Sequence, residues 1–245
     1  MSNDTFKDLE DVVEDTPQNL PIAKNKEALA IFGEASSLDE LLEDNQGLQM
    51  QLASIKIPGS GGTTFELEDP TTGETEPKKE LKGIILASVP TNVYYESAYD
   101  GDSVPPDCSS MGGVFGTVLE DGTQRECKSC PFNQFGSGAN GGKACQNRTS
   151  VYILLEGETL PRLFSLPATA TQNYNKFRSA LFVRKARLAS VLVSIKLEKV
   201  QSKSGIPYSR PTFAVAGKTV DQPAEMQQAA LDSIMVLKCM GILKH

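Results

Sequence analysis

The spacing of apolar and polar residues predicts mainly strands from residue 52 onward. The two kinds alternate in LASIKIP (52–58) and again in TTFELED (63–69), and the glycine-rich run between these stretches is typical of a turn, so we expect a hairpin. Residues 69–80 are polar and predict a loop. LKGIILASVPTNVYY (81–95) is a longer β-prone stretch, and Pro90 favours a break there, as at a bulge or a sheet edge.

A hairpin and then a helix are predicted in the middle of the chain. SVYILLEGETLPRLFSLP (150–167) has apolar runs on both sides of a Glu-Gly-Glu turn signal. The period of apolar residues then changes from that of a strand to that of a helix. Tyr174, Phe177 and Leu181 lie on one face at helical spacing, and the lysines and arginines of residues 168–186 lie off that face. This pattern indicates an amphipathic helix with a basic side.

The last elements are another hairpin and a closing helix. Residues 188–200 and 208–217 alternate on either side of a Ser-Gly-Pro-containing turn. Asp221 and Pro223 have the spacing of a helix cap and a first helical position, so we expect a helix in residues 221–245. Cys239 would lie on its apolar face as a core residue.

Five strands with a helix between the third and the fourth have the element order of an OB-fold barrel. We therefore predict a mainly β protein with flanking helices (α+β), with an OB-like five-stranded body in residues 51–220. An insertion at 101–149 interrupts this body. Residues 1–50 are an acidic leader with two short helical patterns, and a helix in 221–245 ends the chain.

Charge is distributed unevenly along the chain. Residues 1–81 carry 6 Lys or Arg against 18 Asp or Glu, whereas residues 82–245 carry 18 against 13. An acidic segment joined to a basic body indicates nucleic-acid binding, although a leader that merely improves solubility has the same composition. No signal peptide is evident, and the apolar runs are shorter than the roughly 18 residues of a membrane span, so we expect a cytoplasmic protein of a bacterial host or phage-infected cell.

Four of the five cysteines fall within one glycine-rich stretch, residues 107–149. Cys127 and Cys130 have the C-x-x-C spacing that lets two thiolates reach one ion, and Cys108 and Cys145 complete a tetrahedral set. We predict a structural zinc site, because four thiolates leave no open position for a substrate. Incidental thiols, a disulfide or an iron–sulfur cluster are the alternatives. The single histidine is terminal, which excludes a histidine-based metal site or a Ser-His-Asp triad.

Aromatic and basic residues are interleaved around this stretch, as in proteins that stack bases on flat rings and hold phosphates with cations. Each ring taken singly is as well explained by core packing. The glycine-rich loop 136–143 does not fit a P-loop, but its backbone amides are candidates for contact with a nucleic-acid backbone. No catalytic constellation is evident, so we expect no enzyme. The candidate nucleic-acid contacts are Tyr94, Tyr95, Lys128, Phe132, Phe135, Lys143, Arg148, Tyr152, Arg162, Tyr208 and Arg210.

The stretch CKSCPFNQFGSGANGGKACQNRTSVYILLEGETLPRLFSLPATA (127–170) resembles a family of prophage and mobile-element proteins. IKIPGSGGTTF (55–65) and GIILASVPTNVYY (83–95) are similar to upstream blocks of that family, so the resemblance covers residues 52–215. More loosely, the chain resembles single-stranded-DNA-binding proteins with a zinc module inside an OB-fold, such as the large subunit of replication protein A and phage helix-destabilising proteins. That resemblance implies zinc ligation by Cys108, Cys127, Cys130 and Cys145.

Our sequence-based hypothesis is a non-enzymatic protein that binds single-stranded DNA during replication or recombination of phage or mobile-element DNA. Its acidic leader would contact replication or recombination proteins. The alternative is a zinc-stabilised adaptor that binds a host polymerase or a defence protein.

Overall fold

The computed structural model describes residues 52–69, 72–97, 104–158, 160–202 and 205–218, together with residues 228, 230, 232–234, 236 and 237. All of the described residues belong to one unit, Gln49–His245. The predicted acidic leader and Cys239 lie outside the described residues.

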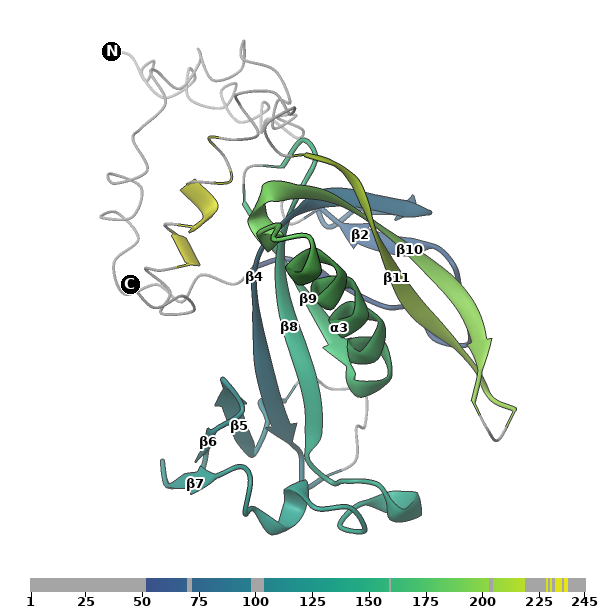
Figure 1. The fold of residues 1–245 in the computed structure, drawn as a ribbon. Helices are drawn as coiled ribbons and strands as arrows, with labels where there is room; N and C mark the ends of the chain where they lie inside the picture. Colours follow the sequence, from purple (N-terminus) through teal and green to yellow (C-terminus); the bar gives the residue numbers. More distant parts are fainter. Residues whose placement is uncertain are drawn as a thin grey trace, which may run out of the picture. The chain divides into compact units, whose positions relative to one another are not determined.

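The described part is mainly β and contains two sheets (Figure 1). The larger, nine-stranded sheet consists of β1 (Ser54–Ile55), β4 (Glu80–Tyr94), β5 (Cys108–Met111), β6 (Phe115–Val118), β7 (Gln124–Glu126), β8 (Gln146–Leu155), β9 (Arg162–Pro167), β10 (Val191–Gln201) and β11 (Pro207–Lys218). The smaller sheet consists of β2 (Phe65–Glu68) and β3 (Thr75–Lys78). The helix α3 (Ala168–Val183) follows β9, and three short 3-10 helices occupy Pro131–Asn133, Ala139–Gly141 and Leu188–Ser190.

β4 is the strand through which the larger sheet is connected. One of its edges pairs antiparallel with β8 from Gly83 to Val93. Its other edge is divided, because residues 80–84 pair with β10 and residues 91–94 pair with β5. The resulting order of the long strands is β9-β8-β4-β10-β11, and the short strands β5, β6 and β7 extend from the far end of β4. The described pairings do not include one between β9 and β11, which would close a five-stranded barrel.

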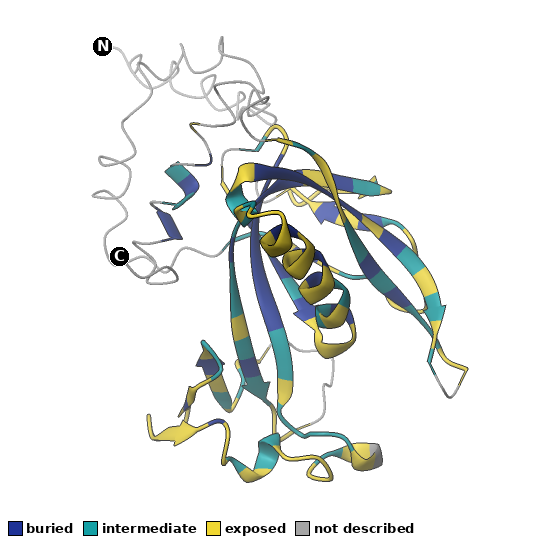
Figure 2. Cartoon of the chain, in the orientation of Figure 1, coloured by how far each residue is buried: buried dark blue, intermediate teal, exposed yellow. Residues whose placement is uncertain are grey.

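The main core lies between one face of this sheet and α3. Alternate residues of β8, such as Val151 and Ile153, point into it and are fully buried. α3 contributes Tyr174, Phe177 and Leu181, so the helical face predicted from the sequence is confirmed. In Figure 2 the buried positions of α3 lie toward the strands and the exposed positions lie on the outer side of the helix.

The opposite face of the sheet is also apolar and buried. Ile84, Leu154 and Leu192 cluster with Ala230, and Tyr152 packs in a second cluster with Leu237. Residues 230 and 237 belong to the region predicted as the closing helix, and every residue described there is helical. Because both of its faces are covered, β8 has a nearly continuous apolar sequence at its end, VYILL (151–155), rather than an alternating one.

The hairpins predicted at 150–167 and 188–217 are confirmed as β8–β9 and β10–β11. The hairpin predicted at 52–69 is wrong. β1 instead pairs parallel with β9, and only an isolated bridge joins Lys56 to Glu66. The expected loop at 69–80 contains β3, which pairs with β2. The glycine-rich turn lies where it was predicted, but the strand that follows it, β2, pairs with β3 and not with β1.

β4 does not break at Pro90 as predicted, since it continues through this residue and its irregularity falls between Ile85 and Ala87, but the edge position that a proline favours is confirmed. Pro90 pairs with Thr149 of β8. On the other edge of β4, Pro90 lies between the segment that pairs with β10 and the segment that pairs with β5. A residue without an N–H is tolerated there because no ladder bond is required of it on that side.

Among the described residues, no helix is long and apolar enough to cross a membrane.

We predict that Phe164→Ala destabilises the fold by about 3–5 kcal/mol, because the side chain is fully buried and its loss leaves a cavity. Its ring also contacts the edge of Phe65, with 6.1 Å between ring centroids. The matched control is Phe182→Ala, which removes the same side chain at a position that is 83% exposed and should change stability by less than about 0.5 kcal/mol. Urea unfolding monitored by circular dichroism measures both, and equal effects would contradict the assigned core.

Candidate metal centre and nucleic-acid interface

The cysteine-containing segment forms the connection between β4 and β8. It begins as a three-stranded meander, β5–β6–β7, in which β5 extends the end of β4 by pairing Cys108 with Tyr94. Gly112 and Gly113 make the turn between β5 and β6, and both have positive φ angles that other residues rarely adopt. The meander is thus positioned by backbone pairing with the sheet rather than by a core of its own.

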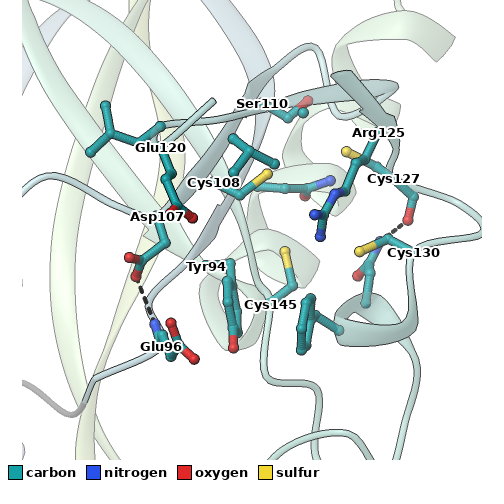
Figure 3. A pocket seen from close by; sticks show the side chains of 16 residues that line it. Tyr94, Glu96, Asp107, Cys108, Ser110, Glu120, Arg125, Cys127, Cys130 and Cys145 are labelled. Atoms are coloured by element: carbon teal, nitrogen blue, oxygen red, sulfur yellow. Dashed lines mark hydrogen bonds between the residues drawn. The ribbon is translucent and has the colours of Figure 1, made fainter. Parts of the chain in front are cut away.

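All four predicted metal ligands line one cavity of about 310 Å³ (Figure 3). Cys108 comes from β5, Cys127 follows β7, Cys130 precedes the first 3-10 helix and Cys145 precedes β8. The prediction that these four residues come together is therefore supported by the arrangement of the chain. All four are free thiols, which leaves them available as ligands.

Gly116 on β6 leaves the space that two of these sulfurs occupy. A Cβ atom at this position would lie 2.9 Å from the Sγ of Cys108 and 3.6 Å from the Sγ of Cys127. The first distance is shorter than real Cβ contacts allow, so any side chain at position 116 would displace the Cys108 sulfur. The sequence analysis did not single out this glycine.

The thiols also influence each other's protonation. Burial raises the pKa of Cys108, and the neighbouring Cys127 and Cys130 raise it further. Burial and the three other thiols raise the pKa of Cys145 to about 11. A bound divalent cation would offset this effect at Cys108 and Cys145 by stabilising their thiolates.

Among the residues that the structure describes, no group of three or more His, Cys, Asp or Glu side chains is arranged so that it could hold a metal ion as it stands. Metal binding would therefore require the side chains that line this cavity to rearrange. The donor chemistry fits zinc, which favours four thiolates in structural sites.

The C-x-x-C turn is held by amide side chains that the sequence analysis missed. Asn133 donates from Nδ2 to the carbonyl oxygen of Cys127 at 2.7 Å. Gln134 donates from Nε2 to the carbonyls of Lys128 and Cys130, at 2.8 and 3.2 Å. These bonds fix the loop between the two cysteines without apolar burial. The role could have been predicted from the two amide residues that directly follow the sequence C-x-x-C-P-F.

The glycine-rich loop is likewise closed by its own bonds. The backbone amides of Gly136, Gly138 and Gly142 donate to carbonyl oxygens within residues 139–142. Ser137 Oγ accepts from the backbone N–H of Ala144 at 3.0 Å. The amides of these three glycines are thus used inside the loop, and they do not form the free phosphate cradle that the sequence allowed.

Several predicted nucleic-acid contacts gather on or beside this insertion. Phe132 stacks on Tyr94, with 4.3 Å between centroids and 16° between ring planes, so each ring has one face covered. Phe135 is 83% exposed, and Lys143 Nζ lies 5.2 Å from its ring centroid. Lys128 is exposed on the C-x-x-C turn. Two more members of the predicted set are nearby along the strands, Tyr95 at the end of β4 and Arg148 near the start of β8.

Other predicted contacts are placed elsewhere. Tyr152 is 4% exposed and packs in the cluster with Leu237, and Arg162 is 7% exposed. Arg162 donates from Nε to Glu158 at 2.7 Å and from Nη1 to the carbonyl of Glu68 at 2.8 Å, so its cation is used internally. Burial raises the pKa of Glu158, and the bond from Arg162 opposes that effect. Tyr152 and Arg162 therefore have structural roles.

Tyr208 and Arg210 lie on β11, away from the cysteine insertion. β11 pairs with β10, which joins the first residues of β4, whereas the insertion extends from the last residues of β4. Arg210 donates from Nε to Glu198 at 2.7 Å across the β10–β11 pair. The structure thus divides the predicted interface into a group at the insertion and a separate pair on β11.

Comparison of the chain with known protein families, with curated proteins and with solved structures finds no match.

We predict that the purified chain contains about one zinc ion, as a four-thiolate site requires. Gly116→Ala should reduce this content, because the added methyl group would lie 2.9 Å from the Cys108 sulfur and force that side chain to shift. Inductively coupled plasma mass spectrometry on protein purified without chelator gives the metal content.

The control for this substitution is Gly59→Ala, since a Cβ atom there meets no other atom within 4 Å. Cys127→Ser should reduce the zinc content as Gly116→Ala does, whereas Ser129→Ala in the same turn should leave it unchanged. Zinc content that is unaffected by Cys127→Ser would disprove the site.

Proposed function

We propose that this protein binds single-stranded DNA without catalysing a reaction, and that the cysteine insertion forms the contact surface. The observation that carries the proposal is the exposed Phe135 ring with the Lys143 cation beside it, on a loop held by polar bonds. A flat exposed ring with an adjacent cation suits a stacked base and the phosphate next to it. The setting we propose is replication or recombination of phage or mobile-element DNA.

The order of the elements supports an OB-like body for this function. β4, β8, β9, β10 and β11 are five long strands in chain order, with α3 between the third and the fourth. β4 pairs with both β8 and β10, as the first strand of an OB-fold pairs with the second and the fourth. The cysteine insertion then occupies the connection between the first two strands, which is one of the loops that OB-folds use to bind oligonucleotides.

The binding surface proposed here differs from the one expected from the sequence. Base stacking on Tyr152 is not part of the proposal, because the sheet face that carries it is apolar and buried. Contacts from Lys128, Phe135, Lys143 and Arg148 remain, with Tyr95 at the edge of the same region. In this proposal zinc has a structural role: Cys108, Cys127, Cys130 and Cys145 would fix the loop that carries Phe135 and Lys143.

The adaptor function is a second candidate, and the meander provides a specific observation in its favour. Met111, Val114, Phe115 and Leu119 are each more than half exposed, at 57%, 60%, 58% and 60%. Large apolar side chains gathered on so small a meander are typical of a protein–protein contact. A partner such as a host polymerase or a defence protein would bind there, next to the DNA surface.

We predict that the chain binds fluorescein-labelled oligo-dT and that Phe135→Ala weakens binding roughly 5- to 150-fold, the effect of losing about 1–3 kcal/mol of stacking. Fluorescence anisotropy of the labelled DNA is the suitable measurement because the chain has no tryptophan. Binding should fall with rising salt, and Lys128→Gln should reduce the slope of log K against log salt by about 0.7.

Phe115→Ala is the matched control, since it removes an exposed phenylalanine from the meander rather than from the glycine-rich loop. It should leave DNA binding unchanged. The two variants exchange their effects if the adaptor function is correct: Phe115→Ala would abolish capture of a partner from nuclease-treated lysate, and Phe135→Ala would not. Absence of oligo-dT binding at low salt would refute the DNA proposal.

A further inference from the structure

The end of α3 presents two adjacent apolar side chains to solvent. Phe182 is 83% exposed and Val183 is 80% exposed, although Leu181 beside them is fixed in the main core. Figure 2 shows this outer side of α3 as exposed. The anchored neighbour holds the last turn in place, so the exposure of Phe182 and Val183 is a property of the helix and not of a loose end. Paired large apolar residues held outward in this way are typical of a contact surface.

A hollow of about 510 Å³ adjoins these two residues. Its lining includes Arg178 and Ser179 from the preceding turn of α3 and Leu188 from the connection to β10. Arg178 and Phe182 are four residues apart and thus lie on the same side of the helix. The surface therefore combines apolar side chains, chiefly Phe182, Val183 and Leu188, with polar ones and a cation.

The charged residues that precede and follow the lining of this hollow along the chain are all cations. The sequence contains no Asp or Glu from residue 159 through residue 197. The exposed cations of α3 and of the turn after it have no ion pair among the described residues, although Arg178 lies 5.8 Å from the ring centroid of Tyr174. These cations are Lys176, Arg178, Arg184, Lys185 and Arg187.

Lys185 is held in a backbone conformation that normally requires glycine. Its φ is +54°, and it ends α3 in a Schellman motif: its N–H donates to Phe182 O at 2.9 Å, and the N–H of Ala186 donates to Leu181 O at 3.0 Å. Among the described residues, nine glycines adopt positive φ, and only Ser60 and Lys185 do so with a side chain. A lysine at this position costs conformational energy that glycine would avoid, and it places a cation between Val183 and Ala186, two residues that line the hollow.

We propose that this surface, formed by Arg178, Phe182, Val183, Arg184, Lys185, Arg187 and Leu188, binds an acidic peptide segment of a partner protein. An apolar side chain of the peptide would lie in the hollow against Phe182 and Leu188. Its carboxylates would face the surrounding cations, in an arrangement of an apolar centre and a charged rim.

The chemistry favours a peptide over a nucleic acid. Both offer negative charge, and the exposed Phe182 ring alone would also accept a stacked base, but the aliphatic Val183 and Leu188 beside it are suited to an apolar side chain. An apolar hollow is filled by a side chain such as Phe or Leu, which a peptide carries and a sugar–phosphate backbone lacks. This surface is separate from the cysteine insertion, so its partner is recognised independently of single-stranded DNA.

The test uses the full chain and a short fluorescein-labelled peptide of Asp, Glu and Ser with one central Phe. We expect saturable binding by fluorescence anisotropy that weakens with salt. A peptide with Ser in place of Phe, and one with Asn and Gln in place of the acids, should each bind more weakly. Phe182→Ala should reduce affinity about 5- to 30-fold, as for a central contact residue, and Ile206→Ala, which removes a 64% exposed apolar side chain between β10 and β11, should not.

Lys185→Gly separates a binding role from a structural one. It should raise the urea midpoint of unfolding, because glycine suits the positive φ, while it weakens peptide binding roughly threefold or more. A more stable variant with unchanged peptide affinity would overturn the proposal. So would equal binding of the acidic and amide peptides, or a loss of oligo-dT binding in Phe182→Ala and Lys185→Gly without any loss of peptide binding, which would assign the surface to nucleic acid.

Discussion

The structure depends on the pairing of β4 with three strands at once. A strand has only two edges. One edge of β4 pairs with β8, and different segments of the other edge pair with β10 and with β5. The register of the β4–β8 pairing shifts between Ile85 and Ala87, directly after Ile84, the last residue that pairs with β10. Such a bulge bends a strand. The length of β4, 15 residues, follows from this division, because a strand of ordinary length could not serve both partners.

The cysteine insertion illustrates how a segment is ordered without a core. Of its four cysteines only Cys127 is buried, and its loops are closed by bonds from Asn133, Gln134 and Ser137 to backbone groups. Such bonds each contribute little net stability in contact with water. A metal ion shared by four thiolates would contribute far more, and it would bring together chain segments that are distant in sequence. The hydrogen bonds set the conformation of the loops, and a metal ion bound by the four thiolates would stabilise it.

Local patterns were predictable from the sequence, and pairings between distant segments were not. The buried face of α3 follows from the spacing of Tyr174 and Phe177, which depends only on neighbouring residues. The role of Arg162 depends on Glu158 and on the carbonyl of Glu68, which is 94 residues away in the chain. Tyr152 illustrates the same limit, because alternation places it on a sheet face but does not reveal that residues near the end of the chain cover that face. The four cysteines could be grouped from the sequence because thiols are few and two of them form a C-x-x-C pair, and the structure places all four around one cavity.

Covering both faces of the sheet has a consequence for where binding can occur. The broad apolar faces of β4 and β8 are used for stability, by α3 on one side and by residues near 230 and 237 on the other. The most exposed aromatic side chains of the described residues lie in parts that project from the sheet: Phe115 and Phe135 in the insertion and Phe182 at the end of α3. Each has a different chemical surrounding. Phe135 has a lysine beside it, Phe115 has apolar neighbours and Phe182 has several cations nearby in the sequence. For this reason we propose a different ligand for each: single-stranded DNA, a partner protein and an acidic peptide.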